Sequence, residues 1–157
     1  MGIFSSKSKD KDMEVNFMMV DGIPGIGKGT AVAVGIKDSL LTIRMRLSKE
    51  DPYTLQLAKI TNVTVLSEKE IIEKQKSVAG RAVVGGVLLG PLGAIIGGMS
   101  GIGNKKKSDT HYYMIINYVS NDDKKALSFE IVGASIGWTK LVDTIRAHIP
   151  NTENKEL

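Results

Sequence analysis

Residues 82–104 form an uncharged stretch, and this stretch limits the possible folds more than any other part of the sequence. It reads AVVGGVLLGPLGAIIGGMSGIGN and lies between Arg81 and the run Lys105, Lys106 and Lys107. Its length and apolarity are those of a membrane-spanning helix. The sequences on both sides of it, however, have the patterns of β-strands. A single crossing would therefore divide one sheet between the two sides of a membrane.

Seven segments have β-type patterns, five before the uncharged stretch and two after it. Asp38-Ser39 supplies turn chemistry for a first hairpin, and Asn121-Asp122-Asp123-Lys124 supplies it for a second. The earlier segments alternate or are rich in β-branched residues, which favours strands. The predicted strands are residues 15–20, 30–37, 40–47, 54–57, 60–66, 111–119 and 126–132.

The last predicted element is an amphipathic helix near the C-terminus. Ser135 is positioned to cap its start and Pro150 follows its end. Its apolar residues recur at helical spacing: Trp138, Leu141, Val142, Ile145 and Ile149. Seven strands and one terminal helix exclude alternating βαβ units. They predict a mainly β (α+β) fold, a seven-stranded antiparallel barrel or sandwich capped by the helix.

The segment between the fifth and sixth strands is predicted to be an inserted helical hairpin. Ser67 and Glu70 have capping-box spacing, so a helix is expected to start near Glu68. Gly90-Pro91 marks a turn, because proline lacks an amide donor and disfavours helix in the residue before it. The two halves, 82–90 and 92–103, would be about 13 and 18 Å long as helices. Each is shorter than the roughly 30 Å hydrocarbon core, so the hairpin could enter one leaflet without spanning the bilayer.

Small residues recur along the uncharged stretch in two series of every fourth position. Such faces let helices approach closely, in lipid or in an oligomer. The hairpin would also bring Arg81 and the three lysines to one surface, where each cation contributes about 1 kcal/mol near anionic headgroups. A soluble or pore-like oligomer, or a hairpin packed on the barrel, is the alternative. The predicted membrane or oligomer face comprises Ala82, Gly86, Gly90, Gly93, Ala94, Gly97, Gly98 and Gly101.

The loop GIPGIGKGT, residues 22–30, matches the glycine pattern of a phosphate-binding loop and resembles that of adenylate-kinase-type nucleotide kinases. Its matching residues are Gly22, Gly27, Lys28 and Thr30. That chemistry requires a helix directly after the lysine, with free amides facing the phosphate. Residues 40–47 instead alternate as a strand, and no βαβ unit surrounds the loop. A nucleotide site is therefore only a minor alternative, and the prediction is a chain without catalytic residues or a cofactor.

Composition excludes some further classes of site. The chain has no cysteine, and its two histidines, His111 and His148, lie far apart in the sequence, so no metal site is expected. The formal charge of +4 suits weak attraction to anionic partners. Few aromatic residues are present for stacking on bases, so neither a specific nucleic-acid partner nor a small-molecule substrate is predicted. The first residues, 1–13, are expected to be a flexible charged tail without a secretory signal, which predicts a cytoplasmic protein.

With these elements in order, the chain resembles bacterial pleckstrin-homology-like proteins of the kind common in Firmicutes and their phages. The resemblance covers about residues 14–149, and the glycine-rich block with its basic end, RAVVGGVLLGPLGAIIGGMSGIGNKKK, is its most specific part. It implies a pleckstrin-homology (PH)-like barrel and a habit of membrane or self-association, and it implies no reaction. The expected organisation is a tail (1–13), barrel strands one to five (14–66), the insertion (67–109), the last two strands with the helix (110–150) and a second tail (151–157).

The sequence therefore predicts a non-enzymatic binding or scaffold module associated with the inner face of the membrane. Its expected partners are a lipid surface, copies of itself, or both, together with a protein that the sequence does not identify. The alternative is a self-assembling glycine-zipper oligomer.

Overall fold

The computed structural model describes residues 13–77, 83–84, 87–88 and 111–149. Seven strands form one antiparallel sheet in the order β4-β3-β2-β1-β9-β8-β5. The sheet bends around a shared interior, and β4 and β5 are its two edges. The strands are β1 (Met13–Asp21), β2 (Ala31–Lys37), β3 (Leu40–Met45), β4 (Tyr53–Gln56), β5 (Ile60–Ser67), β8 (Tyr112–Ser120) and β9 (Asp123–Ile131). The predicted seven-stranded antiparallel fold with a C-terminal helix is confirmed.

Both predicted hairpin turns are present, and each contains two consecutive residues of positive φ. Asp38 (52°) and Ser39 (67°) join β2 to β3, and Asn121 (53°) and Asp122 (69°) join β8 to β9. Positive φ at both central residues defines the turn whose twist matches that of the flanking strands. The second hairpin is longer than predicted, because β9 begins at Asp123, opposite Ser120, and not at Ala126.

The short elements between the barrel strands follow the local sequence. A 3₁₀ turn, η1 (Leu57–Lys59), joins β4 to β5, and α2 (Glu68–Ser77) follows β5 directly. The predicted capping box is present at the start of α2. The Ser67 amide donates to the Glu70 carboxylate over 2.8 Å, and the Glu70 amide donates to Ser67 Oγ over 3.1 Å. These two bonds satisfy amide donors that the first turn of a helix otherwise leaves unpaired.

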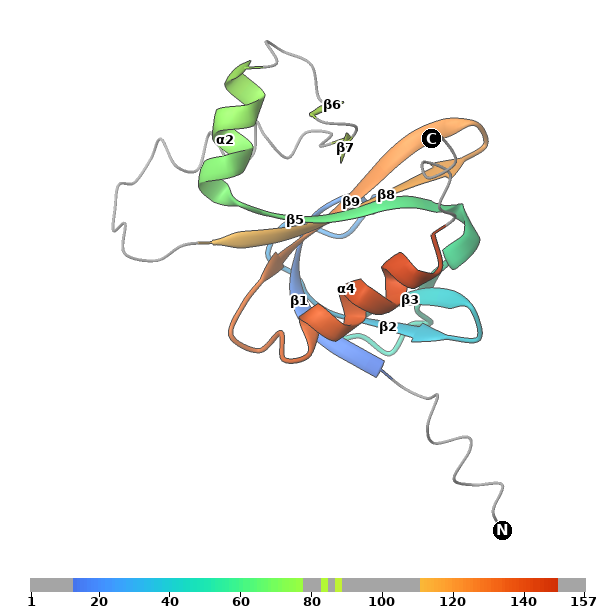
Figure 1. Cartoon of the computed structure of the whole chain (residues 1–157). Helices are drawn as coiled ribbons and strands as arrows, with labels where there is room; N and C mark the ends of the chain where they lie inside the picture. Colours follow the sequence, from blue (N-terminus) through green and yellow to red (C-terminus); the bar gives the residue numbers. More distant parts are fainter. Residues whose placement is uncertain (1–12, 78–82, 85–86, 89–110, 150–157) are drawn as a thin grey trace.

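The C-terminal helix α4 (Trp138–Ala147) closes the barrel. It packs against β1 and β5 and lies across the opening below β5 in Figure 1. Leu141, Val142 and Ile145 are buried in the main core, and Trp138 is partly buried against it. The same core contains Phe17 of β1 and Phe129 of β9, whose rings are 5.7 Å apart. The apolar residues predicted at helical spacing are therefore the residues that pack into the barrel core.

The predicted cap at Ser135 is wrong. Gly137, with φ at 93°, is the N-cap residue, and no side chain caps the helix. Ser135 is buried and holds the preceding loop instead. Its Oγ accepts a hydrogen bond from the Val132 amide over 3.0 Å and donates one to the Asn16 carbonyl of β1. A serine hydroxyl bonds equally well to loop backbone and to helix amides, so sequence position alone did not distinguish the two.

Candidate functional site

The inserted segment leaves the barrel and returns to it at one place. Ser67, the last residue of β5, is paired with Tyr112, the first residue of β8. The Glu68 amide donates to the His111 carbonyl over 2.8 Å, so the contact between the two ends continues one residue into the insertion. We call these four residues, Ser67, Glu68, His111 and Tyr112, the root of the insertion. Both ends of the insertion are thus fixed to the same end of the same strand pair.

Polar groups surround the root. His111 Nδ1 lies 2.7 Å from the Glu130 carboxylate, and the two side chains are 47% and 24% exposed. Tyr113 is buried next to them. Burial, followed by the negative charges of Glu130 and Glu68, raises the pKa of its phenol well above the usual value. A half-exposed contact between a histidine and a carboxylate, and a neutral buried phenol, therefore lie at the root.

The strands next to the root bury residues on both of their faces. Met114 and Ile116 of β8 point into the barrel and belong to the main core. Tyr113 and Ile115 point the opposite way and form a second cluster with Val20 of β1. Helix α2 completes this cluster with Ile71, and Leu66, Ile72 and Ala126 pack around it. We call Val20, Tyr113, Ile115 and Ala126 the outer face of the sheet.

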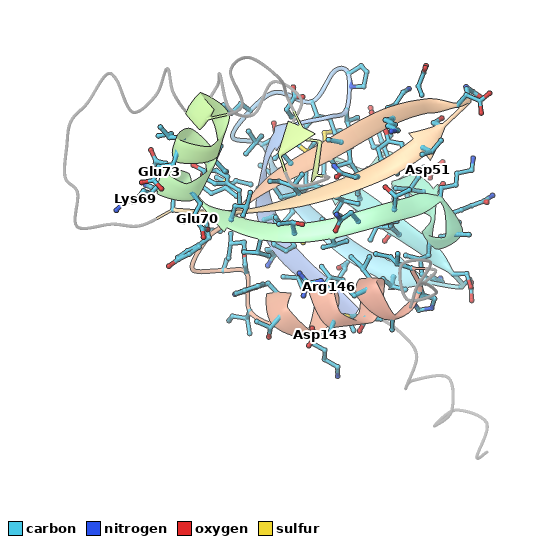
Figure 2. All side chains as sticks on the ribbon, turned by 45° about the horizontal axis from the view of Figure 1, so that its top comes forward. Asp51, Lys69, Glu70, Glu73, Asp143 and Arg146 are labelled. Carbon is cyan, nitrogen blue, oxygen red and sulfur yellow. The ribbon has the colours of Figure 1, made fainter. Side chains whose placement is uncertain are left out.

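Figure 2 shows the polar side of α2. Lys69, Glu70 and Glu73 project away from the barrel, opposite the side that carries Ile71. The helix thus lies on the outer face with its apolar side inward, as expected for a surface helix. It directs the chain into the glycine-rich stretch from a position above the sheet.

The start of the glycine-rich stretch is a short hairpin, not a helix. β6 (Val83–Val84) pairs antiparallel with β7 (Val87–Leu88), in the register Val83 to Leu88 and Val84 to Val87. The predicted helical half over 82–90 is therefore wrong at these four positions. β-branched valines favour strands, and the two intervening residues are glycines, a pair that two-residue hairpin loops accept.

The hairpin lies beside the barrel. Residues of β7 and β9 approach within 8 Å between Cα atoms, and Figure 1 shows β6 and β7 above the β8–β9 pair. The remaining predicted residues of the stretch, including the turn at Pro91, lie outside the described residues, as do Arg81, the three flanking lysines and the predicted tails apart from Met13, which begins β1. No helix in the described part of the chain is long and apolar enough to cross a membrane.

The loop of residues 22–30 connects β1 to β2, and Ile26 is its one buried residue. The chain continues after Lys28 into strand β2, so the helix that a phosphate-binding loop requires is replaced by a strand. Ile26 is buried in the main core, and Thr30 Oγ1 donates to the Gly27 carbonyl over 2.7 Å. Gly22 has φ at 125°, and a Cβ there would lie 2.8 Å from Leu127 Cα. The glycines of this loop therefore allow its turns and, at Gly22, its close approach to β9.

Two features of the site were not predicted, and only the first of them has a signal in the sequence. Residues 113–116 of β8, Tyr-Met-Ile-Ile, are continuously apolar, which is typical of a strand buried on both faces. A strand is predicted here from the sequence, but a buried outer face is not. The second feature is the contact between His111 Nδ1 and the Glu130 carboxylate, which requires the β8–β9 register and has no local signal. Among the described residues, no group of three or more His, Cys, Asp or Glu side chains is placed to hold a metal ion.

A family model described as a glycine zipper containing PH domain matches residues 26–133, about two thirds of the chain and all of the insertion. Neither the curated proteins nor the solved structures contain a significant match.

Proposed function

The chain belongs to the family of glycine zipper containing PH domains, and from this premise we propose that it is a non-catalytic binding module that docks on an anionic membrane surface through residues 82–104. PH domains commonly bind lipids or proteins and are generally non-catalytic. The proposal includes a bacterial or phage origin and a position on the cytoplasmic face of the membrane. The docked module would then present its barrel to a partner protein at that surface.

The observation that carries this proposal is the geometry of the root. Because Ser67 pairs with Tyr112, the two ends of the insertion lie on the same side of any membrane that the insertion meets. An odd number of crossings is incompatible with the intact β5–β8 ladder. The uncharged stretch has 23 residues, and one crossing takes about 20, so two crossings do not fit. Shallow insertion from one side is the membrane arrangement that satisfies both limits.

The basic flank gives the proposal its electrostatic part. Arg81 precedes the uncharged stretch and the three lysines follow it, so both ends of the stretch would lie near the headgroups. Each cation is worth about 1 kcal/mol beside an anionic leaflet. Replacing all three lysines by serine should therefore weaken binding by about 3 kcal/mol, which is roughly 150-fold.

The test is co-sedimentation of the full chain with phosphatidylcholine vesicles, with and without phosphatidylglycerol. The Lys105→Ser, Lys106→Ser, Lys107→Ser variant should lose binding to the anionic vesicles. The matched control, Lys37→Ser, Lys124→Ser, Lys140→Ser, removes the same charge from exposed positions of the barrel and should lose much less. Equal losses would show that the insertion is not the contact. No binding of the unmodified chain to anionic vesicles would refute membrane docking.

The same samples separate membrane docking from self-assembly. Replacing Gly86, Gly90 and Gly98 by leucine should disrupt helix packing in a glycine-zipper oligomer, because the added side chains keep the backbones apart. Light scattering on a sizing column measures the assembly. If the assembly becomes smaller and vesicle binding is unchanged, self-association through this stretch is real and is separate from docking.

A further inference from the structure

The outer face of the sheet is more apolar and more buried than an external barrel surface requires. Ile115 lies on the side opposite the barrel interior and is nevertheless fully buried, and Tyr113 is 3% exposed. On the neighbouring strand β9, Ser128 is paired with Ile115 and is also buried. The outward side chains of a barrel strand normally meet water. This part of the sheet is instead an interface.

Helix α2 and the β6–β7 hairpin are the described elements on this side of the sheet. α2 contributes Ile71 and Ile72, which pack with Tyr113 and Val20 near the root. The β6–β7 hairpin lies over β9, which contributes Ala126 to the outer face. Only five residues separate Ser77, where α2 ends, from Val83, where β6 begins. The connection is short enough to keep the start of the glycine-rich stretch near this sheet.

We propose that the outer face is an intramolecular docking site for the start of the glycine-rich stretch, and that this stretch must leave the face before it can insert into a lipid surface. The occupant is the β6–β7 hairpin, Val83–Leu88, of the same chain. The second half of the proposal rests on the membrane docking proposed above; the first half stands on the position of the hairpin alone.

The physical basis is competition between two apolar environments. Docking removes the hairpin from water on the barrel, and insertion removes it from water in the leaflet, so the two states exclude each other. A substitution that destabilises only the docked state should increase binding to vesicles. The size of this increase depends on the equilibrium constant for docking on the barrel, because a substitution can at most remove the free-energy cost of leaving the docked state.

Docking can be tested with disulfides, because the chain has no cysteine of its own. Leu88→Cys is combined in turn with cysteine at the outward β9 positions 124, 126 and 128, and oxidation is followed by non-reducing electrophoresis. At least one pair should form an intramolecular disulfide whose yield does not change on dilution, because Cα atoms of β7 and β9 approach within 8 Å and a disulfide joins Cα atoms up to about 7 Å apart. The control pair, Leu88→Cys with Thr54→Cys on edge strand β4, should not. If no β9 pair exceeds the control, or if the products are dimers, intramolecular docking is wrong.

Release is tested with a charge on the outer face. Ala126→Glu puts a carboxylate into a partly buried position of this face and lowers the net charge. On electrostatics alone it should weaken binding to anionic vesicles. Competition predicts the opposite, an increase of about tenfold, together with a lower yield of a cross-link at position 124 or 128. Thr54→Glu, with the same charge change at an exposed position, should bind slightly more weakly than the unmodified chain.

The two proposals fail in different ways. If a β9 pair cross-links more than the control pair but no variant binds vesicles, membrane docking is refuted, and so is its competition with docking on the barrel. Intramolecular docking then stands. Vesicle binding without cross-linking would refute intramolecular docking and leave the membrane proposal intact. A folded Ala126→Glu variant that binds no better than Thr54→Glu would refute competition. Fluorescence of the single tryptophan, Trp138, which packs on the core, reports whether each variant is folded.

Discussion

Replacing Gly22 by alanine should destabilise the barrel far more than the same change at other glycines of the 22–30 loop. Gly22 has φ at 125°, and an added Cβ would lie 2.8 Å from Ala126 O and Leu127 Cα and 2.9 Å from Leu127 Cδ2. Two of these atoms are backbone of β9, which can give way only by moving the strand. The left-handed conformation costs an alanine about 1–2 kcal/mol, and overpacking costs about 1–3 kcal/mol more. The expected loss is about 3 kcal/mol.

The same loop provides graded controls. Gly29 has φ at 89° but open space around a Cβ, so Gly29→Ala should cost only the conformational term, about 1–2 kcal/mol. Gly27 has neither a positive φ nor a neighbour within 4 Å. Gly27→Ala should therefore change stability by less than about 0.5 kcal/mol, or stabilise the fold slightly by restricting the unfolded chain.

The assay is urea unfolding followed by the fluorescence of Trp138. With a slope of about 2 kcal/mol per molar urea, the Gly22→Ala midpoint should fall by about 1.5 M, the Gly29→Ala midpoint by less than 1 M, and the Gly27→Ala midpoint hardly at all. Similar losses for all three variants would contradict the packing derived for this loop. A stable Gly22→Ala variant would show that the loop does not approach β9 as closely as the structure has it.

Three further predictions concern polar side chains of the barrel and its C-terminal helix. Ser135→Ala should cost about 1–3 kcal/mol, because the Val132 amide and the Asn16 carbonyl both lose a partner; a loss below 0.5 kcal/mol in urea unfolding would contradict this role. Arg146→Met keeps the aliphatic stem but removes the bonds to the Val63 carbonyl at 3.1 and 3.3 Å, and should cost about 1–2 kcal/mol by the same measurement. The raised pKa of Tyr113 means that the folded chain keeps this proton while the unfolded chain loses it above about pH 10. Stability should be unaffected by this group below that pH and fall above it, and Tyr113→Phe should make the fall shallower.

The first two of these predictions have matched controls. Ser48→Ala removes an exposed bond to the Glu50 amide and should cost less than Ser135→Ala. Arg44→Met removes an exposed ion pair with Glu14 and should cost less than about 1 kcal/mol. If Arg146→Met costs no more than Arg44→Met, the bonds to the edge strand β5 are not stabilising. An unchanged slope above pH 10 in Tyr113→Phe would assign the effect to another group.

The strands of the barrel could be predicted because the residues that the structure buries are apolar, and their spacing in the sequence is that of a strand. In β3, Leu41 and Ile43 are buried and alternate with less buried residues, so the period of two is visible. β9 was predicted to start three residues late for the same reason. Asp123, Lys124 and Lys125 are exposed, and their pairing with β8 depends on backbone hydrogen bonds that leave no hydrophobic pattern. Sequence patterning therefore revealed the buried part of each strand and missed its solvated extension.

The candidate site was less predictable because its geometry is set by pairing between distant residues. The capping box of α2 is local and was predicted correctly. The outer face combines Val20, Ile71 and Tyr113 from three separate elements, and each has an ordinary local sequence. The β6–β7 hairpin was missed because the glycine periodicity was read as helical. The same residues also contain Val-Val-Gly-Gly-Val, which suits a tight hairpin equally well.

The compatibility of these residues with both a helix and a hairpin bears on how the insertion functions. Glycine weakens both helices and strands by about 0.5–1 kcal/mol per residue relative to alanine, so a glycine-rich stretch has a weak conformational preference of its own. Its structure is then decided by what it packs against. On the barrel, Val83–Val84 and Val87–Leu88 form paired strands beside β9. In a leaflet, where each backbone polar group must be satisfied within the segment, helix is the favoured form. A stretch richer in alanine or leucine would be committed to helix before it met either partner, whereas this composition leaves the choice to the surface that the stretch contacts.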